Sequence, residues 1–575
     1  MKESHYFHDD TVILNYSKQY FRSALELLSS EGFRDFLGLY LPDLKENHYQ
    51  LYTWLHGRKK TDLELEDEII KVVKYLLVVE PSEIKDDLLE NRADFLLAIE
   101  EAYNFWRKMQ RVSFLYTHNE EGYQLQNFIE ADNNMNALVL DLYRTIEEKL
   151  QGAPNKVYRQ LHAGTNASLL LQYYDWDTPE EYQKLAGIPF VNEAMIRTPL
   201  ILHPHSSKRT NVFKETDHNP VDDFPGDPDE EWICFPAKIG SLLIFAYFHR
   251  NYISSCVGMA NLFELASPAD AKGKRPDAIE LFGVEDGTKD TTFFHDKKNN
   301  IWVGKVSAAP EIDYFGYTKK SLLTLHNLAM IERGWLPIHG AMVNIYLKDG
   351  RKKGLMFMGD SGAGKSETLE ALSTMASDLI DHQETVFDDM GSLHIDENGR
   401  IRAQGTEIGA FVRLDDLDKG TAYRDMDRSI FFNPEKANAR VVVPASPYYV
   451  VTHDQEVDCF LYANNYTDKR GMHLFSSREE AEPVFIEGKR FALGTTQEKG
   501  LSTTFFANPF GPMQKQAETK VLIDRIFDKL FEENIPVGEI YTCLGLPNKG
   551  DHGITKAAEA LMNFAILGKA EESDK

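Results

Sequence analysis

The chain has 575 residues, enough for roughly three or four domains, and its 42% hydrophobic and 27% charged residues are typical of a globular protein, which excludes disorder as the main state. Its 63 lysines and arginines are outnumbered by 90 aspartates and glutamates, and the net charge of −27 repels nucleic acid and anionic membranes. We therefore expect no nucleic-acid or membrane partner, and an anionic small substrate would need a local cluster of basic residues.

The cysteines and the N-terminus favour a cytoplasmic protein. None of the 4 cysteines forms a C-x-x-C pair, so the sequence predicts neither a zinc ribbon nor a disulfide framework. The first residues, MKESHYFHDD, contain no apolar segment after a basic start, unlike a signal peptide. The longest apolar stretch, near residues 241–248, is too short to span a bilayer.

Residues 1–155 are predicted to be helical. Apolar residues recur at helical spacing, as at Leu65, Ile69 and Val72, while charged residues fill the opposite faces. No pattern in this region points to chemistry. The sequence therefore predicts an all-α accessory module that offers a surface to a protein partner or to self-association.

The composition changes after residue 155. Short β-type runs, separated by loops rich in proline, aspartate and histidine, predict a mixed α/β domain over residues 156–310. Strands and helices alternate over residues 311–567, which predicts a second α/β domain. The histidines and aspartates of residues 203–229 match no fixed pattern of metal ligands, so we interpret this segment as a solvated surface loop.

A phosphate-binding loop is the clearest motif in the chain. The sequence GDSGAGKS fits G-x-x-x-x-G-K-[ST] at every position, with an apolar run before it and a helical pattern after it. Backbone N–H groups of such a loop close around phosphate oxygens, Lys365 would reach the β- and γ-phosphates, and the Ser366 hydroxyl would bind Mg²⁺. The predicted nucleotide-binding residues are Gly359, Asp360, Ser361, Gly362, Ala363, Gly364, Lys365 and Ser366.

Two adjacent carboxylates follow this loop and its helix. Asp388 and Asp389 come at the end of the run ETVFDD. A phosphate-bound metal ion needs a carboxylate at the end of a neighbouring strand, and adjacent side chains can both contribute where a strand ends and curls. We expect one of the two to bind metal and the other to accept a proton or a hydrogen bond.

These motifs resemble two related families. The run HGAMVNI, which begins at His339, and the following GLMFMGDSGAGKSETLEAL closely resemble HPr kinase/phosphorylase. The wider arrangement, over roughly residues 300–565, resembles ATP-dependent phosphoenolpyruvate carboxykinase. Residues 406–411 and 545–562 are also similar to segments of the carboxykinases. The resemblance implies a carboxykinase-like P-loop core with a mixed sheet over residues 311–567, and makes residues 156–310 the substrate side.

The carboxykinase resemblance also implies roles for individual residues. Tyr314 corresponds to a tyrosine that contacts substrate, and Lys320, His339 and Asp389 correspond to ligands of a catalytic manganese ion. Arg440 corresponds to the arginine that meets the transferred phosphoryl group. Chemistry agrees with this set, because an imidazole and a carboxylate suit Mn²⁺ and a lysine ligates metal when burial lowers its pKa.

The implied function is the ATP-dependent decarboxylation and phosphorylation of oxaloacetate, with ATP, Mg²⁺ and Mn²⁺ as cofactors. Two departures leave alternatives open. The loop ends Lys365-Ser366-Glu367, as in the HPr kinases, and Arg197 is only the nearest candidate for the arginine that binds the substrate carboxylate. One alternative is a kinase that acts on a protein or small-molecule hydroxyl, with Asp388 or Asp389 as general base. The other is a non-catalytic nucleotide sensor.

Overall fold

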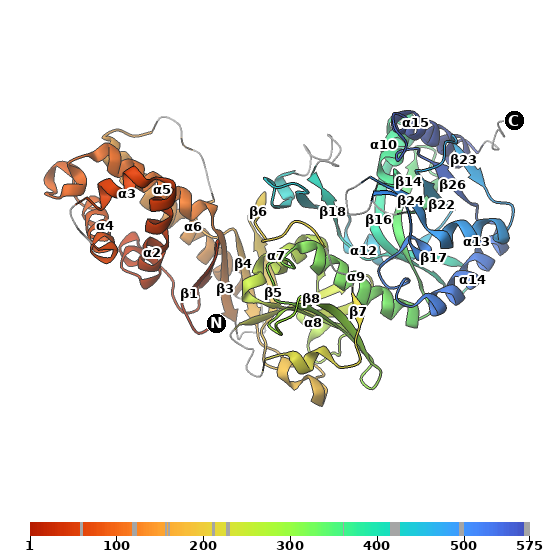
Figure 1. The fold of residues 1–575 in the computed structure, drawn as a ribbon, viewed down its shortest axis with the longest axis horizontal. Helices are drawn as coiled ribbons and strands as arrows, with labels where there is room; N and C mark the ends of the chain where they lie inside the picture. The colour runs from red at the N-terminus through yellow and green to blue at the C-terminus, as the bar shows by residue number, and fades with distance from the viewer. Residues whose placement is uncertain are drawn as a thin grey trace. The chain divides into compact units, whose positions relative to one another are not determined.

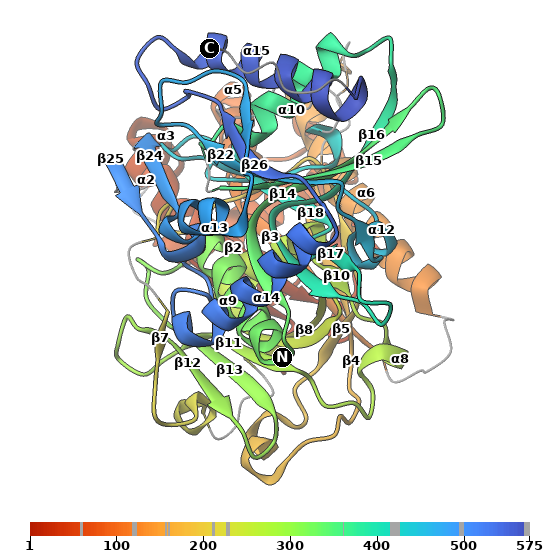
Figure 2. The same ribbon diagram turned by 90° about the vertical axis from the view of Figure 1, so that its right-hand side faces the viewer.

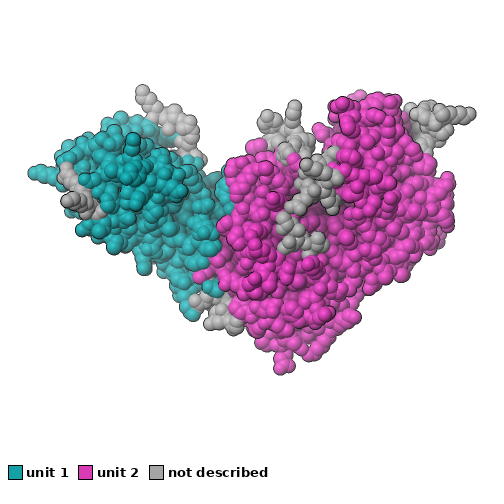
Figure 3. Space-filling view, in the orientation of Figure 1, with its two compact units in different colours: residues 1–174, 187–203, 229–231 teal, residues 175–186, 204–228, 232–575 magenta. Residues whose placement is uncertain are grey.

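The computed structural model describes residues 1–57, 61–117, 124–155, 158, 162–209, 213–225, 231–359, 362–414, 426–493 and 499–568. Helices and sheets of mixed strand direction make up these residues, so the mixed α/β class is confirmed (Figure 1). The chain divides into two compact units, one of residues 1–174, 187–203 and 229–231 and the other of residues 175–186, 204–228 and 232–575 (Figure 3). Within the described residues, no helix combines the length and the apolar character that crossing a membrane requires.

The first unit combines helices with a small sheet. Its helices are α1 (Ala24–Leu28), α2 (Glu31–Asn47), α3 (Tyr49–Leu55), α4 (Asp62–Leu76), α5 (Arg92–Lys108) and α6 (Gln124–Gln151). Its strands pair in the order β1 (His5–His8), β2 (Thr11–Asn15), β3 (Gln110–Thr117), β4 (Ala167–Gln172) and β5 (Phe190–Ile196). Leucine and aromatic side chains from α2 to α6 share one apolar core. The Ser30 side chain caps α2, and Thr61 and Glu64 form a capping box that begins α4.

The prediction of an all-α module over residues 1–155 is wrong, because β1, β2 and β3 lie within it. The strand β3 pairs in parallel with both β2 and β4, and β4 lies beyond residue 155. A strand buried on both faces has no alternation of polar and apolar residues, so the search for helical spacing overlooked it. The predicted boundaries at 155 and 310 therefore do not coincide with the limits of the two compact units.

The second unit contains an eight-stranded sheet with helices on both faces. The strand order is β21 (Gln455–Glu456), β17 (Ile401–Gly405), β16 (Ile380–Ile395), β14 (Leu336–Leu347), β15 (Lys352–Met358), β22 (Cys459–Asn464), β26 (Val537–Tyr541) and β23 (Met472–Leu474). Figure 2 shows α10 (Lys365–Met375) and α15 (Gly550–Leu561) on one face, and α13 (Arg478–Glu487) and α14 (Gln516–Glu532) on the other. Each helix pair closes an apolar core against the sheet.

Further strands of the second unit pair in the order β8 (Trp232–Ile239), β9 (Leu242–His249), β11 (Ala278–Val284), β13 (Ile301–Ser307), β12 (Thr291–Asp296) and β7 (Lys214–Glu215). A small antiparallel group consists of β18 (Gly409–Arg413), β20 (Arg440–Pro444) and β19 (Ile430–Phe432). The buried helix α9 (Phe315–Glu332) packs against β11, β13 and β14. The other elements are α7 (Ile253–Leu262), β10 (Glu264–Leu265), α8 (Pro268–Ala271), α12 (Tyr448–Thr452), β24 (Lys489–Leu493) and β25 (Lys499–Thr503).

The register of β14 gathers the predicted site residues in one row across the sheet. Gly340 pairs with Met358 at the end of β15 and with Asp389 of β16. The N–H of Gly359, the first residue of the phosphate loop, donates to the carbonyl of His339 at 3.0 Å. A Cβ at position 340 would lie 1.9 Å from a backbone carbonyl oxygen, so only glycine permits this close approach.

A buried carboxyl group lies beneath the helix that carries the lysine pair. Glu280 of β11 is fully buried, and neither of its oxygens has a hydrogen-bond partner among the described residues. Burial raises the pKa of Glu280 to about 8, an effect that Ser321 of α9 partly offsets. Because this pKa is above that of an exposed glutamate, the fold favours the protonated form. The resulting stability is complete at low pH and is lost as the pH rises through about 8.

We predict that Glu280→Gln reduces the dependence of stability on pH. The free energy of unfolding of the wild type should fall by on the order of 3 kcal/mol between about pH 5 and pH 8 relative to this variant. Urea unfolding at several pH values measures the difference, with Glu285→Gln, at an exposed position just after the same strand, as the matched control. Parallel pH profiles for the wild type and Glu280→Gln would contradict the prediction.

Candidate active site

The carboxylate of Asp389 is the centre of a cluster of charged side chains. Its Oδ2 accepts hydrogen bonds from Nζ of Lys319 at 2.7 Å and Nζ of Lys320 at 2.5 Å. Its Oδ1 lies 2.9 Å from Nε2 of His339. Glu407 extends the cluster, with Oε1 2.7 Å from Nζ of Lys319. Three predicted site residues from α9, β14 and β16 therefore meet at one point.

Asp389 occupies this position in an unusual backbone conformation. The sequence predicted that the two aspartates end a strand, which is wrong, because β16 continues past both of them to Ile395. Instead, Asp389 has a φ of 139°, which L-amino acids rarely adopt. The adjacent carboxylates consequently have different neighbours: Lys365 is the strongest charged neighbour of Asp388, and Lys319 that of Asp389.

The two adjacent lysines differ in their tendency to lose a proton. Burial alone would lower the pKa of both. For Lys319, whose side chain is 1% exposed, contacts with Asp389 and Glu407 outweigh burial and raise its pKa above the ordinary value. For Lys320, burial and the neighbouring Lys319 prevail and the pKa is lowered. Lys319 is thus a fixed positive charge, and Lys320, which is 20% exposed, is the amine closer to neutrality.

The two acids of the cluster, Asp389 and Glu407, also differ in pKa. Burial tends to raise the pKa of Asp389, but Lys319, Lys320 and His339 together hold it well below its usual value. For Glu407, burial and the nearby Asp389 outweigh the two lysines and raise its pKa to about 7. Asp389 is therefore the permanent anion of the site, whereas Glu407 changes its charge near neutral pH.

His339 is oriented by hydrogen bonds at both ring nitrogens. Its Nδ1 donates to the carbonyl oxygen of Ala507 at 2.9 Å. Its Nε2 faces Oδ1 of Asp389 at 2.9 Å, so Nε2 is the ring atom that a metal ion at this carboxylate could bind in place of a hydrogen. A backbone carbonyl that fixes the outer nitrogen in this way is the usual second contact of a histidine that binds metal.

The rings of Phe510 and Phe411 contact further charged groups around this cluster. The Phe510 ring lies 4.5 Å from Nζ of Lys320 and 4.9 Å from the guanidinium carbon of Arg209, and its centroid is 5.7 Å from that of His339. Arg209, an exposed residue, therefore lies close to the lysine that borders the cluster. Its loop was interpreted from the sequence as a plain surface loop, which overlooked this placement.

The second ring, that of Phe411, contacts residues from α9 and β20. Its centroid is 5.6 Å from the guanidinium carbon of Arg440, 5.7 Å from Nζ of Lys319 and 6.2 Å from the ring of Tyr314. Tyr314 is buried and directly precedes α9. Predicted residues from distant parts of the chain are thus neighbours here, and the site contains the local basic cluster that an anionic substrate needs.

Residues at the ends of two neighbouring strands donate hydrogen bonds to the phosphate loop. Asn465, just after β22, donates to the carbonyl of Gly362 at 2.9 Å, and Thr542, just after β26, donates to that of Ala363 at 2.8 Å. Gly364 precedes α10 with a φ of 88°, which favours glycine. Nζ of the buried Lys365 donates to the carbonyl of Gly359 at 2.8 Å, and Ser366 is exposed in the first turn of α10. Asp360 and Ser361 lie outside the described residues.

The predicted metal ligands are an amine, an imidazole and a carboxylate. No group of three or more histidine, cysteine, aspartate or glutamate side chains among the described residues could hold a metal ion. The set predicted at Asp389 differs from such a group, because one of its members is a lysine. The orientation of His339 and the lowered pKa of Lys320 both fit binding of a first-row divalent cation.

The structure does not support Arg197 as the arginine for a substrate carboxylate. Its guanidinium donates to the buried carboxylate of Asp132 and, at 2.9 Å, to the side-chain oxygen of Asn133, all within the first unit. The resulting ion pair already balances its charge. Arg209 was missed because only the folded chain brings it to Phe510, and its neighbours in the sequence gave no signal beyond the basic pair Lys208–Arg209.

Neither models of known protein families nor curated proteins give a match to this sequence. Two lysines of different basicity and a histidine contact the carboxylate of Asp389, and the phosphate-loop motif lies in the same unit.

We predict that Asp389→Asn destabilises the protein by about 3 kcal/mol, because it leaves the buried Lys319 with too little negative charge. The double variant Lys319→Met/Asp389→Asn should recover at least half of this loss, since the uncompensated cation is then absent. Guanidinium unfolding measures both effects. Asp381→Asn, at a position of β16 whose side chain is 61% exposed, is the matched control and should be neutral. Wild-type stability of Asp389→Asn would show that the carboxylate does not hold the cluster together.

Proposed function

We propose that this protein is a phosphoenolpyruvate carboxykinase-like enzyme, with a carboxykinase-like P-loop core, that uses ATP to convert oxaloacetate into phosphoenolpyruvate, ADP and CO₂. The observation that carries the proposal is the meeting of Lys320 and His339 on Asp389, in the same row of the sheet as the phosphate loop. A kinase that only transfers phosphate to a hydroxyl has no need of this second site beside its nucleotide.

The reaction requires one bond to break before another forms. The bond between the departing carboxylate and the methylene carbon breaks, and its electron pair passes into the enolate. The enolate oxygen then attacks the γ-phosphorus, and ADP leaves with the bridging oxygen. Lys320, His339 and Asp389 would hold a first-row cation such as Mn²⁺, which supplies Lewis-acid polarisation of the substrate's oxygens. Ser366 would hold the Mg²⁺ of the nucleotide.

The charged side chains of the site match the demands of this chemistry. Arg209 beside Lys320 is suited to bind a substrate carboxylate through paired N–H donors. Arg440 and Lys319, which share the Phe411 ring, supply positive charge for the phosphoryl group in transfer. Phosphoryl transfer depends mainly on positioning and on electrostatic stabilisation, so these fixed charges and Lys365 account for its requirements.

A kinase remains the second candidate, and one observation favours it. Burial raises the pKa of Asp388, while the nearby Lys365 partly counteracts this effect. A carboxylate of raised pKa beside a phosphate loop suits a general base that accepts a proton from an attacking hydroxyl. In a kinase of this kind, Lys320 would have no direct part, and that difference separates the two functions experimentally.

We predict nucleotide-dependent release of CO₂ from oxaloacetate and stimulation by Mn²⁺ at a fixed concentration of Mg·ATP. Lys320→Met and His339→Ala should each abolish the stimulation and reduce turnover about 100-fold, because each removes a metal contact. Affinity for Mg·ATP, measured by calorimetry, should remain unchanged, since neither residue belongs to the phosphate loop. Lys297→Met, at an exposed lysine, is the matched control.

Full turnover with Mg²⁺ alone, together with an unaffected Lys320→Met variant, would contradict the carboxykinase proposal. Phosphorylation of a protein or small-molecule hydroxyl under those conditions would establish the kinase. Loss of nucleotide affinity in Lys320→Met would instead show that this lysine belongs to the nucleotide site.

We predict that Arg209→Gln raises the KM for oxaloacetate at least tenfold, because a charge-assisted pair of hydrogen bonds to the substrate carboxylate is lost. The affinity for Mg·ATP should not change. Steady-state kinetics of Arg209→Gln and of the neighbouring exposed control Lys208→Gln distinguish this role from a general effect of charge. Equal changes in both variants would contradict a specific contact between Arg209 and the substrate.

A further inference from the structure

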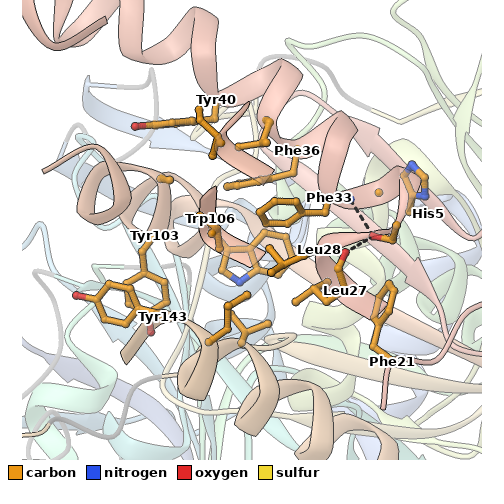
Figure 4. Close-up of a pocket in the computed structure, with 18 of the residues that line it drawn as sticks. His5, Phe21, Leu27, Leu28, Phe33, Phe36, Tyr40, Tyr103, Trp106 and Tyr143 are labelled. Atoms are coloured by element: carbon orange, nitrogen blue, oxygen red, sulfur yellow. Dashed lines mark hydrogen bonds between the residues drawn. The ribbon is translucent and has the colours of Figure 1, made fainter. Parts of the chain in front are cut away.

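The first unit contains an apolar cavity of about 150 Å³ that has no part in the proposed reaction. All of its lining residues lie between Ser4 and Ile146. Figure 4 shows the aromatic side chains of Phe33, Phe36 and Trp106 grouped at its wall. Helices α1, α2, α4, α5 and α6 and strands β1 and β2 contribute to the lining.

Aromatic rings give the cavity a well-defined wall. Phe36 is the common neighbour, with its ring centroid 5.9 Å from that of Phe33 and 5.8 Å from those of Trp106 and Phe105. Its contact with Trp106 is edge to face at 88°. Rings held in this way favour another aromatic ring as an additional neighbour, because edge-to-face and offset contacts are the preferred geometries.

Most polar atoms of the wall already have partners within the protein. The Ser30 hydroxyl donates to the carbonyl of Leu27 and accepts from the N–H of Phe33. The hydroxyl of Tyr40 donates to the carbonyl of Ala98 at 2.7 Å. His5 contacts a serine and an aspartate through its two ring nitrogens, the indole N–H of Trp106 donates to a backbone carbonyl, and Tyr143 donates to a glutamate.

Two hydroxyl groups are exceptions. Those of Tyr16 and Tyr103 are buried without a hydrogen bond among the described residues. Apart from such groups, the lining consists mostly of apolar side chains.

We propose that this cavity is a binding site for a neutral, apolar molecule with a single aromatic ring. A dry cavity of about 150 Å³ lined by leucine, isoleucine and phenylalanine is large enough for benzene. An empty cavity of this size leaves its lining atoms without dispersion contacts, and a ring that fits would restore them. Charged molecules are disfavoured, because the described lining contains no lysine, arginine, aspartate or glutamate to balance their charge.

Benzene is the direct probe for this site, and the experiment uses the full-length protein. Titration calorimetry should show saturable binding of benzene at one site, whereas benzoate, whose charge the described lining does not balance, should not bind. Ala102→Leu, which adds side-chain volume at a lining position of α5, should weaken benzene binding at least tenfold. The matched control is Ala93→Leu, at an exposed position of the same helix, which should bind as the wild type does.

The opposite results would overturn the proposal. These are the absence of saturable benzene binding in the folded wild type, unchanged binding in Ala102→Leu, or tighter binding of benzoate than of benzene. If Ala102→Leu does not fold, crystals of the wild type under xenon pressure give an independent test. Xenon should bind between Phe33, Phe36 and Trp106, and a cavity without xenon would count against the site.

Discussion

One carboxylate balances the charge of the second unit's site. Asp389 accepts from two consecutive lysines and faces a histidine, and its own pKa is held well below the usual value by these neighbours. Consecutive lysines that approach one point in a buried region would repel each other without such an anion. The same carboxylate links α9, β14 and β16, so the packing of three elements and the electrostatics of the site depend on one side chain.

The sheet explains how this carboxylate comes to lie beside a phosphate loop. The central strand β14 pairs with both β15 and β16, and Gly340 lets the strands approach where a side chain would collide with backbone. The loop follows β15, and its first N–H bonds to the residue that supplies the imidazole. The strand register therefore places the phosphate-loop motif beside the predicted metal ligands. The adjacent carboxylates have different strongest cationic neighbours, Lys365 for Asp388 and Lys319 for Asp389.

Features encoded in short segments could be predicted, whereas those that depend on tertiary contacts could not. The phosphate-loop motif and the mixed α/β class follow from local spacing, whereas the grouping of Lys320, His339 and Asp389 was expected from the resemblance to the carboxykinases. Arg209 could not be found in this way, because folding brings its exposed loop to Phe510. Arg197 was considered because of its local sequence, but its guanidinium forms an ion pair with the buried Asp132 in the first unit. The strand β3 was overlooked because it is buried and shows no alternation of polar and apolar residues.

A crystal structure of the full-length protein with Mn²⁺ and Mg·ATP, with diffraction data collected at the manganese absorption edge, tests the central claim most directly. The carboxykinase proposal predicts an anomalous peak bonded to Nζ of Lys320, Nε2 of His339 and the carboxylate of Asp389, distinct from any metal at Ser366. A manganese peak found only at the phosphate loop, with Lys320 still hydrogen-bonded to Asp389, would contradict it.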